Sequence, residues 1–110
     1  MFAEQKNEEA ISHYKMAINL KPNLTKAYYN LGISLFADRK NEEAISHYKM
    51  AIKLNPNYTN AHYNLGIVLV QKGEMKEAVH HFRETLRLRP DLVAARDYLE
   101  LALLQSRGIE

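Results

Sequence analysis

Histidine has the widest chemical range of the residues in this sequence, because imidazole can ligate a metal, carry a proton or act as a base near neutral pH. Three of the five histidines, His13, His47 and His81, recur at intervals of 34 residues, and His80 stands beside the last. Such intervals could form a ladder of metal ligands. We expect a solvated face instead, because side chains one repeat apart cannot approach a shared metal to within ~2 Å.

Catalysis is not expected from the remaining polar residues. His62 occupies the place that Tyr28 holds one interval earlier, so we expect it to be a partly buried packing residue and not a base. No serine, threonine or lysine has a base at a spacing that a helix would bring together. Cysteine is absent, which excludes thiolate chemistry and cysteine-based zinc sites. We therefore predict no catalytic residue, no bound metal and no cofactor.

Charge and hydropathy limit the classes of partner. The formal net charge of the 110 residues is +2, and basic and acidic residues are interspersed. Nucleic acid is therefore not an expected partner. No apolar run approaches the ~18 residues of a membrane span, and Met1 is followed by an amphipathic segment instead of a secretory leader. We expect no membrane contact and a cytoplasmic location.

The elements that position these residues repeat every 34 positions. The segment KNEEAISHYKMAI occupies residues 6–18 and returns unchanged at 40–52, and all three prolines, Pro22, Pro56 and Pro90, fall on the same grid. A fixed period over the whole chain is typical of repeat architectures, in which one supersecondary unit is stacked on the next.

Each repeat contains two amphipathic helices. The apolar and small residues of the repeat at 25–58 form one stripe per helix: Tyr28, Leu31, Gly32 and Leu35 in the first, and Ala44, Tyr48 and Ala51 in the second. Steps of three and four residues place each set on one side of a 3.6-residue helix. Gly32 and Ala44 allow the helix axes to approach to the low end of ~8 to 10 Å. Neither helix can bury its stripe alone, so the two must pair.

The segments AYYNLGISLF at 27–36 and AHYNLGIVLV at 61–70, each followed by an EEA or KEA helix and a proline, resemble tetratricopeptide repeats. The resemblance covers nearly the whole chain. It implies an all-α fold, a right-handed α-solenoid of antiparallel helix pairs whose first helices line a concave groove. We expect about six helices, near 7–20, 25–38, 41–54, 59–72, 75–88 and 92–106.

On this frame the chain is a single repeat domain, 1–110. It divides into a partial repeat with a second helix only at 1–24, full repeats at 25–58 and 59–92, and a C-terminal capping helix at 93–110. Glu100 stands where Gly32 and Gly66 allow close packing, and a carboxylate at this place suits a solvated cap.

A peptide-binding site is expected on the first helices. The residues off the packing stripe and directed at the groove are Lys26, Tyr29, Asn30, Ile33 and Phe36, then Asn60, Tyr63, Asn64, Ile67 and Val70. Tyrosine offers a large contact area at small rotamer cost, as at many recognition surfaces. The alternative is that Ile33 and Ile67 are simply half-buried between neighbouring helices.

Two asparagines extend this argument, because a carboxamide can pair with both polar groups of a peptide backbone. Asn30 and Asn64 resemble the asparagine ladder of O-linked N-acetylglucosamine transferase, although the series stops at Tyr98. The carboxylate clamp of chaperone-binding members is not expected. Tyr29 and Ala94 stand where the clamp would place lysines, and only Asn64 matches its pattern.

We therefore predict a non-catalytic protein-interaction module that binds a peptide or helix segment in its groove. Two alternatives stay open: the substrate-recruiting part of a larger enzyme, and a scaffold unit that self-associates. The segments 7–20 and 92–106 each lack their pairing helix, which would favour a homo-oligomer formed head to tail through exposed terminal helices. Helix exchange is a second route, because Arg39 stands in the turn at 37–44 where the next repeat has Gly73.

Overall fold

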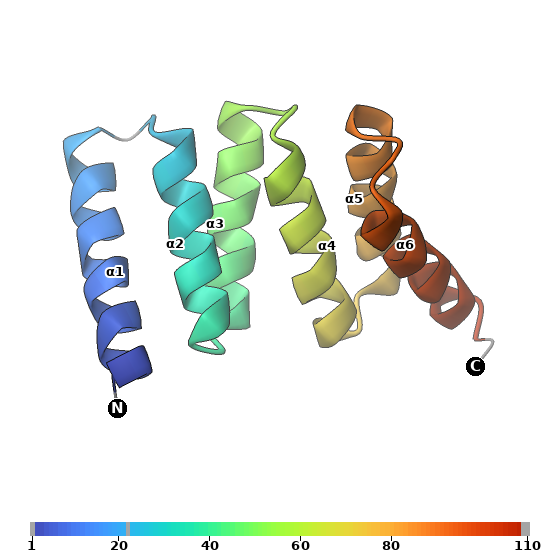
Figure 1. Cartoon of the computed structure of the whole chain (residues 1–110), viewed down its shortest axis with the longest axis horizontal. Helices are drawn as coiled ribbons and strands as arrows, with labels where there is room; N and C mark the ends of the chain where they lie inside the picture. Colours follow the sequence, from blue (N-terminus) through green and yellow to red (C-terminus); the bar gives the residue numbers. More distant parts are fainter. Residues whose placement is uncertain (1, 22, 109–110) are drawn as a thin grey trace. The chain divides into compact units, whose positions relative to one another are not determined.

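The computed structural model describes residues 2–21 and 23–108, with side chains from residue 6 onward. This part of the chain contains six α-helices and no strand: α1 (Phe2–Leu20), α2 (Thr25–Ala37), α3 (Asn41–Leu54), α4 (Thr59–Lys72), α5 (Met75–Leu88) and α6 (Val93–Ser106) (Figure 1). The predicted all-α helical-repeat class is confirmed. In these residues we find no helix with the length and apolar character required to cross a membrane.

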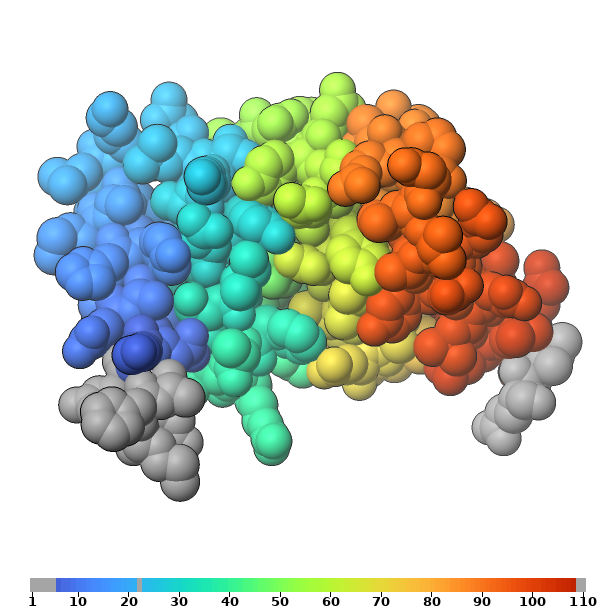
Figure 2. Space-filling view, in the orientation of Figure 1, coloured from blue at the N-terminus to red at the C-terminus, as the bar shows by residue number. Residues whose placement is uncertain are grey.

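The chain forms two compact units, residues 1–56 and 57–110. In unit 1, α2 packs against both α1 and α3, and neighbouring helices run antiparallel (Figure 1). In unit 2, α5 packs against both α4 and α6, and α4 also touches α6. Side chains fill the spaces that separate the ribbons within each unit (Figure 2). Each unit therefore has its own helix-on-helix core.

The core of unit 1 lies between α2 and α3. Its fully or almost fully buried members are the predicted stripe residues Leu31, Leu35, Ala44, Tyr48 and Ala51. Gly32 lies beneath the Tyr48 ring, and a Cβ atom at this glycine would be 2.6 Å from Cε1 of Tyr48. Real Cβ atoms do not tolerate such a distance, so glycine is required here by the aromatic ring that covers it.

Unit 2 repeats this packing between α4 and α5. Gly66 lies beneath Phe82, where an added Cβ would be 2.7 Å from Cε1 of the ring. Thr85 takes the place of an alanine in the stripe, and it is fully buried. Its hydroxyl donates a hydrogen bond to the backbone oxygen of His81 at 2.8 Å, which removes the cost of burying a polar group.

The turns after α2 and α4 have the same hydrogen bonds but different residues at the left-handed position. Gly73 has a φ of 86°, and Arg39 has a φ of 61°. In each turn the next residue donates a backbone hydrogen bond of 2.8 Å, from Lys40 to Leu35 and from Glu74 to Leu69. A hydrogen bond from the sixth residue back to the first, as from Lys40 to Leu35, requires a positive φ at the fifth residue, which is Arg39. Arg39 lacks the conformational freedom that glycine has at this position. The turn therefore carries a backbone strain of order 1 kcal/mol at Arg39.

Helix α1 begins earlier than predicted, at Phe2 instead of residue 7. On the 34-residue frame, residues 4–6 correspond to 38–40, which form the turn between α2 and α3. The sequence AEQK at 3–6 consists of strong helix formers, and here the helix continues through it. The bounds of the other five helices agree with the prediction to within one residue.

Candidate peptide-binding surface

In unit 1 the predicted site residues lie along α2, away from the buried stripe. Lys26 is exposed, and Ile33 is 40% exposed, which makes it one of the most accessible large apolar side chains in the described residues. Tyr29, Asn30 and Phe36 are half-buried. Ile33 therefore keeps more accessible surface than a residue enclosed between helices.

In unit 2 the corresponding residues lie along α4. Asn60 is exposed, whereas Tyr63, Asn64, Ile67 and Val70 are half-buried. Ile67 thus corresponds better to the alternative interpretation, in which this position packs against neighbouring helices. Every predicted site residue retains some accessible surface in its own unit.

The two tyrosines also contribute to the cores. The Tyr29 ring lies 6.0 Å from the Tyr48 ring between centroids, and Tyr63 lies 6.2 Å from Phe82. Such pairs add about 0.5 to 1.5 kcal/mol beyond the area that they bury, and they hold the tyrosine rings in place. Burial raises the pKa of both Tyr48 and Tyr63. Sequence reasoning missed these contacts, although the common spacing of 19 residues, from 29 to 48 and from 63 to 82, indicated that the two pairs are equivalent.

Helix α6 carries a third set of residues at the same positions as the predicted site, one period after α4: Ala94, Asp97, Tyr98, Leu101 and Leu104. Four of them, Ala94, Asp97, Tyr98 and Leu101, line a depression in the surface of unit 2. Sequence reasoning assigned α6 a capping role, which its exposed Glu100 supports, and a role in self-association. It missed this face, although the 34-residue period and the apolar Leu101 indicated it.

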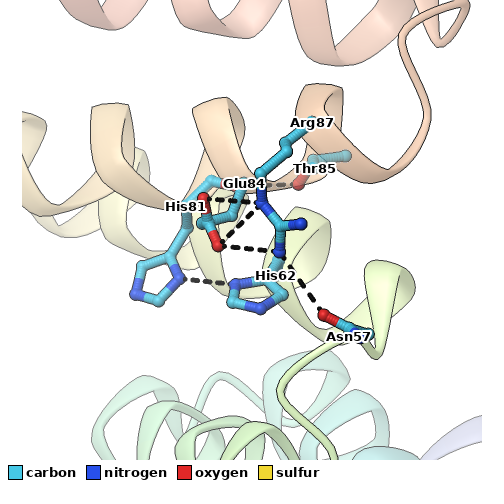
Figure 3. A network of polar contacts seen from close by, with 6 residues as sticks. All are labelled: Asn57, His62, His81, Glu84, Thr85 and Arg87. Carbon is cyan, nitrogen blue, oxygen red and sulfur yellow. Dashed lines mark hydrogen bonds and ion pairs between the residues drawn. The ribbon is translucent and has the colours of Figure 1, made fainter.

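The histidines do not all lie on a solvated face. His13 is exposed and His47 half-buried, but His81 is only 8% exposed, so the prediction for His81 was wrong. Its Nδ1 lies 3.0 Å from Nδ1 of His62, which was predicted to be partly buried and is only 4% exposed (Figure 3). At this distance one nitrogen donates a proton that the other accepts. His81 is buried because α4 provides this partner, whereas α2 presents Tyr28 to His47.

A polar network continues along α5 beside this pair (Figure 3). Arg87 donates hydrogen bonds to the Glu84 carboxylate at 3.2 Å and to Oδ1 of Asn57 at 3.4 Å. The hydrogen bond from Arg87 lowers the pKa of the Glu84 carboxyl. Across the described residues, no group of three or more His, Cys, Asp or Glu side chains has the arrangement needed to hold a metal ion.

Comparison with protein families identifies the repeat. A family model described as TPR repeat matches residues 1–38 and 35–73, and one described as Tetratricopeptide repeat matches residues 59–92. The chain belongs to the tetratricopeptide repeat family. Members of this family are in general non-catalytic protein-interaction modules with a helical-repeat solenoid fold. A search of curated proteins found no match.

Solved structures of tetratricopeptide proteins are similar to this chain. Two crystal structures of MamA each have a TM-score of 0.88 at 30% identity over 94% of the chain, which spans 60% and 56% of their lengths. The first TPR of Spaghetti (RPAP3), bound to the HSP90 peptide SRMEEVD, has a TM-score of 0.90 at 24% identity, over 96% of this chain and 84% of that one. At this identity the likeness to the Spaghetti domain concerns the fold.

Proposed function

We propose that this tetratricopeptide chain binds an extended peptide or a helix segment along the exposed faces of its first helices, without catalysing a reaction. The observation that supports this is the repeated pattern on α2 and α4. At intervals of 34 residues each helix presents a tyrosine, an asparagine and an isoleucine, all at least partly accessible: Tyr29, Asn30 and Ile33, then Tyr63, Asn64 and Ile67.

The chemistry of these side chains suits a peptide. The tyrosine rings are held by the core and provide rigid contact area, so little side-chain entropy is lost on binding. The carboxamides of Asn30 and Asn64 can each donate to and accept from a peptide bond. Because a hydrogen bond contributes about 1 kcal/mol net, two such contacts with a few apolar ones favour binding in the micromolar range.

A peptide-display library panned on the immobilised chain tests this function. Peptides that are enriched are synthesised and titrated by calorimetry against the parent and against the double variant Asn30→Ala, Asn64→Ala. We expect the double variant to bind at least about fivefold more weakly, because two hydrogen bonds to the peptide backbone are lost.

A matched control is available in unit 1. Asn19 and Asn23 are exposed and lie outside α2, so Asn19→Ala, Asn23→Ala should leave peptide affinity unchanged. Thermal unfolding of both double variants separates lost contacts from lost structure. Equal affinity of all three proteins would contradict the role of the asparagines, and the absence of any enriched peptide would contradict the proposed function.

Self-association is a second candidate function, favoured by one observation on α1. Ala10, Tyr14 and Ala17 are only half-buried, whereas the identical stripe on α3 is covered by α2. Helix α6 of a second copy, which corresponds to the first helix of a repeat, would cover the α1 stripe in the same way. Because each large apolar side chain contributes ~1.5 to 3 kcal/mol before the costs of association, we expect weak association at high concentration.

Light scattering after size exclusion, over a hundredfold concentration range, measures this directly. The mass should rise for the parent and stay monomeric for Tyr14→Asp, because a buried carboxylate opposes association. Ser12→Asp is the matched control, since Ser12 is exposed on the same helix outside the stripe. A constant monomeric mass for the parent would exclude this candidate.

A further inference from the structure

The depression on α6 has a chemistry unlike that of the faces on α2 and α4. Its lining consists of Ala94, Tyr98 and Leu101, which are apolar or aromatic, together with the exposed carboxylate of Asp97. At the position of Asp97, α2 and α4 have Tyr29 and Tyr63. One acidic group therefore stands in an otherwise uncharged wall, at a place where the two preceding repeats have an aromatic ring.

Tyr98 gives the depression a fixed wall. Its ring is stacked on the fully buried Phe82, with centroids 5.4 Å apart and an interplanar angle of 8°. It also meets the edge of the Tyr63 ring at 6.1 Å. Since Tyr63 belongs to the proposed peptide-binding face of α4, a residue of that face is in ring contact with a residue that lines the depression. The depression therefore lies beside the α4 face within unit 2.

The Asp97 carboxylate is available to a partner. In the part of the chain that the structure describes, no ion pair or side-chain hydrogen bond involves Asp97. A carboxylate beside an aromatic ring and aliphatic groups attracts a side chain that is apolar along its length and cationic at its end. Lysine and arginine have this structure, whereas an acidic side chain would be repelled.

We propose that the α6 depression holds a lysine or arginine side chain of the bound peptide, with its aliphatic stem against Tyr98 and Leu101 and its cation at the Asp97 carboxylate. This inference rests on the proposed function, because it assigns a specificity to one end of the same binding face. It predicts a basic residue in the ligand near the segment that contacts Tyr63.

The experiment uses peptides enriched on the parent chain in the display selection. We expect these peptides to share a lysine or arginine, which is replaced by glutamine in a second synthesis. Both peptides are titrated against the parent chain and Asp97→Asn. The parent should bind the basic peptide about three- to tenfold more tightly than the glutamine peptide, and Asp97→Asn should bind the two equally.

Two further variants make the result specific. Asp91 is exposed just before α6 and outside the depression, so Asp91→Asn should retain the preference for the basic peptide. In Asp97→Lys the preference should reverse, so that a peptide with glutamate at the basic position binds more tightly than the basic one. Both positions, Asp91 and Asp97, are solvent-exposed, and thermal unfolding verifies that each of the three variants folds.

The outcomes separate this inference from the function on which it rests. Peptides that bind but share no basic residue, or that lose equal affinity in Asp97→Asn and Asp91→Asn, would overturn the α6 site and leave the peptide-binding function intact. Failure to enrich any peptide would overturn both.

Discussion

The segments at 6–18 and 40–52 have the same thirteen residues but different surroundings. In α3, Ala44, Tyr48 and Ala51 are buried against α2, and Tyr48 is only 1% exposed. In α1 the equivalent stripe is half-buried, and Met16 is 61% exposed. The same thirteen residues therefore form a helix in both places, but the Ala-Tyr-Ala stripe is fully buried only in α3.

The difference arises because α2 receives the two helices on different sides. α3 presents its Tyr48 ring to Gly32 of α2. α1 places Asn7 against α2, where the Asn7 side chain donates a 2.7 Å hydrogen bond to the backbone oxygen of Ser34, and Ile11 is buried to the same degree as its equivalent Ile45. Sequence identity thus sets the helix and buries the same isoleucine in both copies, and the neighbouring element decides whether the Ala-Tyr-Ala stripe is covered as well.

The largest expected effect is the cost of removing one tyrosine from each copy. Tyr48→Ala should lower the free energy of unfolding by about 3 to 5 kcal/mol, because it empties a fully buried site beside glycine. Tyr14→Ala should cost about 1 kcal/mol or less, because that ring is half-exposed. Urea unfolding followed by circular dichroism measures both. Equal costs would show that the two segments have the same environment in solution.

The next effect tests why Tyr48 is buried. Gly32→Ala should lower the free energy of unfolding by about 1 to 3 kcal/mol, because the new Cβ forces the Tyr48 ring away from α2. This loss appears despite the roughly 1 kcal/mol advantage of alanine over glycine in a helix.

A double-mutant cycle with Tyr48→Leu isolates the contact. A smaller residue at 48 leaves room for the methyl group, so the cost of Gly32→Ala should largely disappear in the Tyr48→Leu background. Gly66→Ala, beneath Phe82, provides an independent copy of the test in unit 2. A gain in stability from either alanine would contradict the packing of these rings.

The smallest effect concerns the residues that precede the two identical segments. Residues 4–6 are helical, whereas 38–40 form a turn in which Arg39 has a positive φ. Arg39→Gly should raise the free energy of unfolding by about 1 kcal/mol, because glycine adopts this conformation without strain. Gly73→Arg, at the equivalent turn, should lower it by a similar amount. A lower melting temperature for Arg39→Gly would refute the assignment of strain to this turn.

The sequence alone determined the helices and the faces on which they present their side chains. Five of the six helices were predicted to within one residue, because the spacing of stripe residues and the positions of proline and glycine act locally. The predicted face residues are accessible for the same reason: a fixed period places equivalent residues on the same side of each first helix. The start of α1 was predicted wrongly. The 34-residue frame predicted a turn before residue 7, but the residues there can also continue a helix.

The repeat frame also predicted that the stripe at 7–20 lacks its pairing helix, and that stripe is half-buried. Only the tertiary structure decided which polar residues are buried and where the surface is hollowed. His81 was predicted to be solvated, but it is buried because it pairs with His62, 19 residues away on another helix. The depression around Asp97 likewise depends on Phe82 and Tyr63 fixing the Tyr98 ring. Helix formation depends on interactions within a few residues, whereas burial and site geometry arise from contacts between elements, which periodicity does not specify.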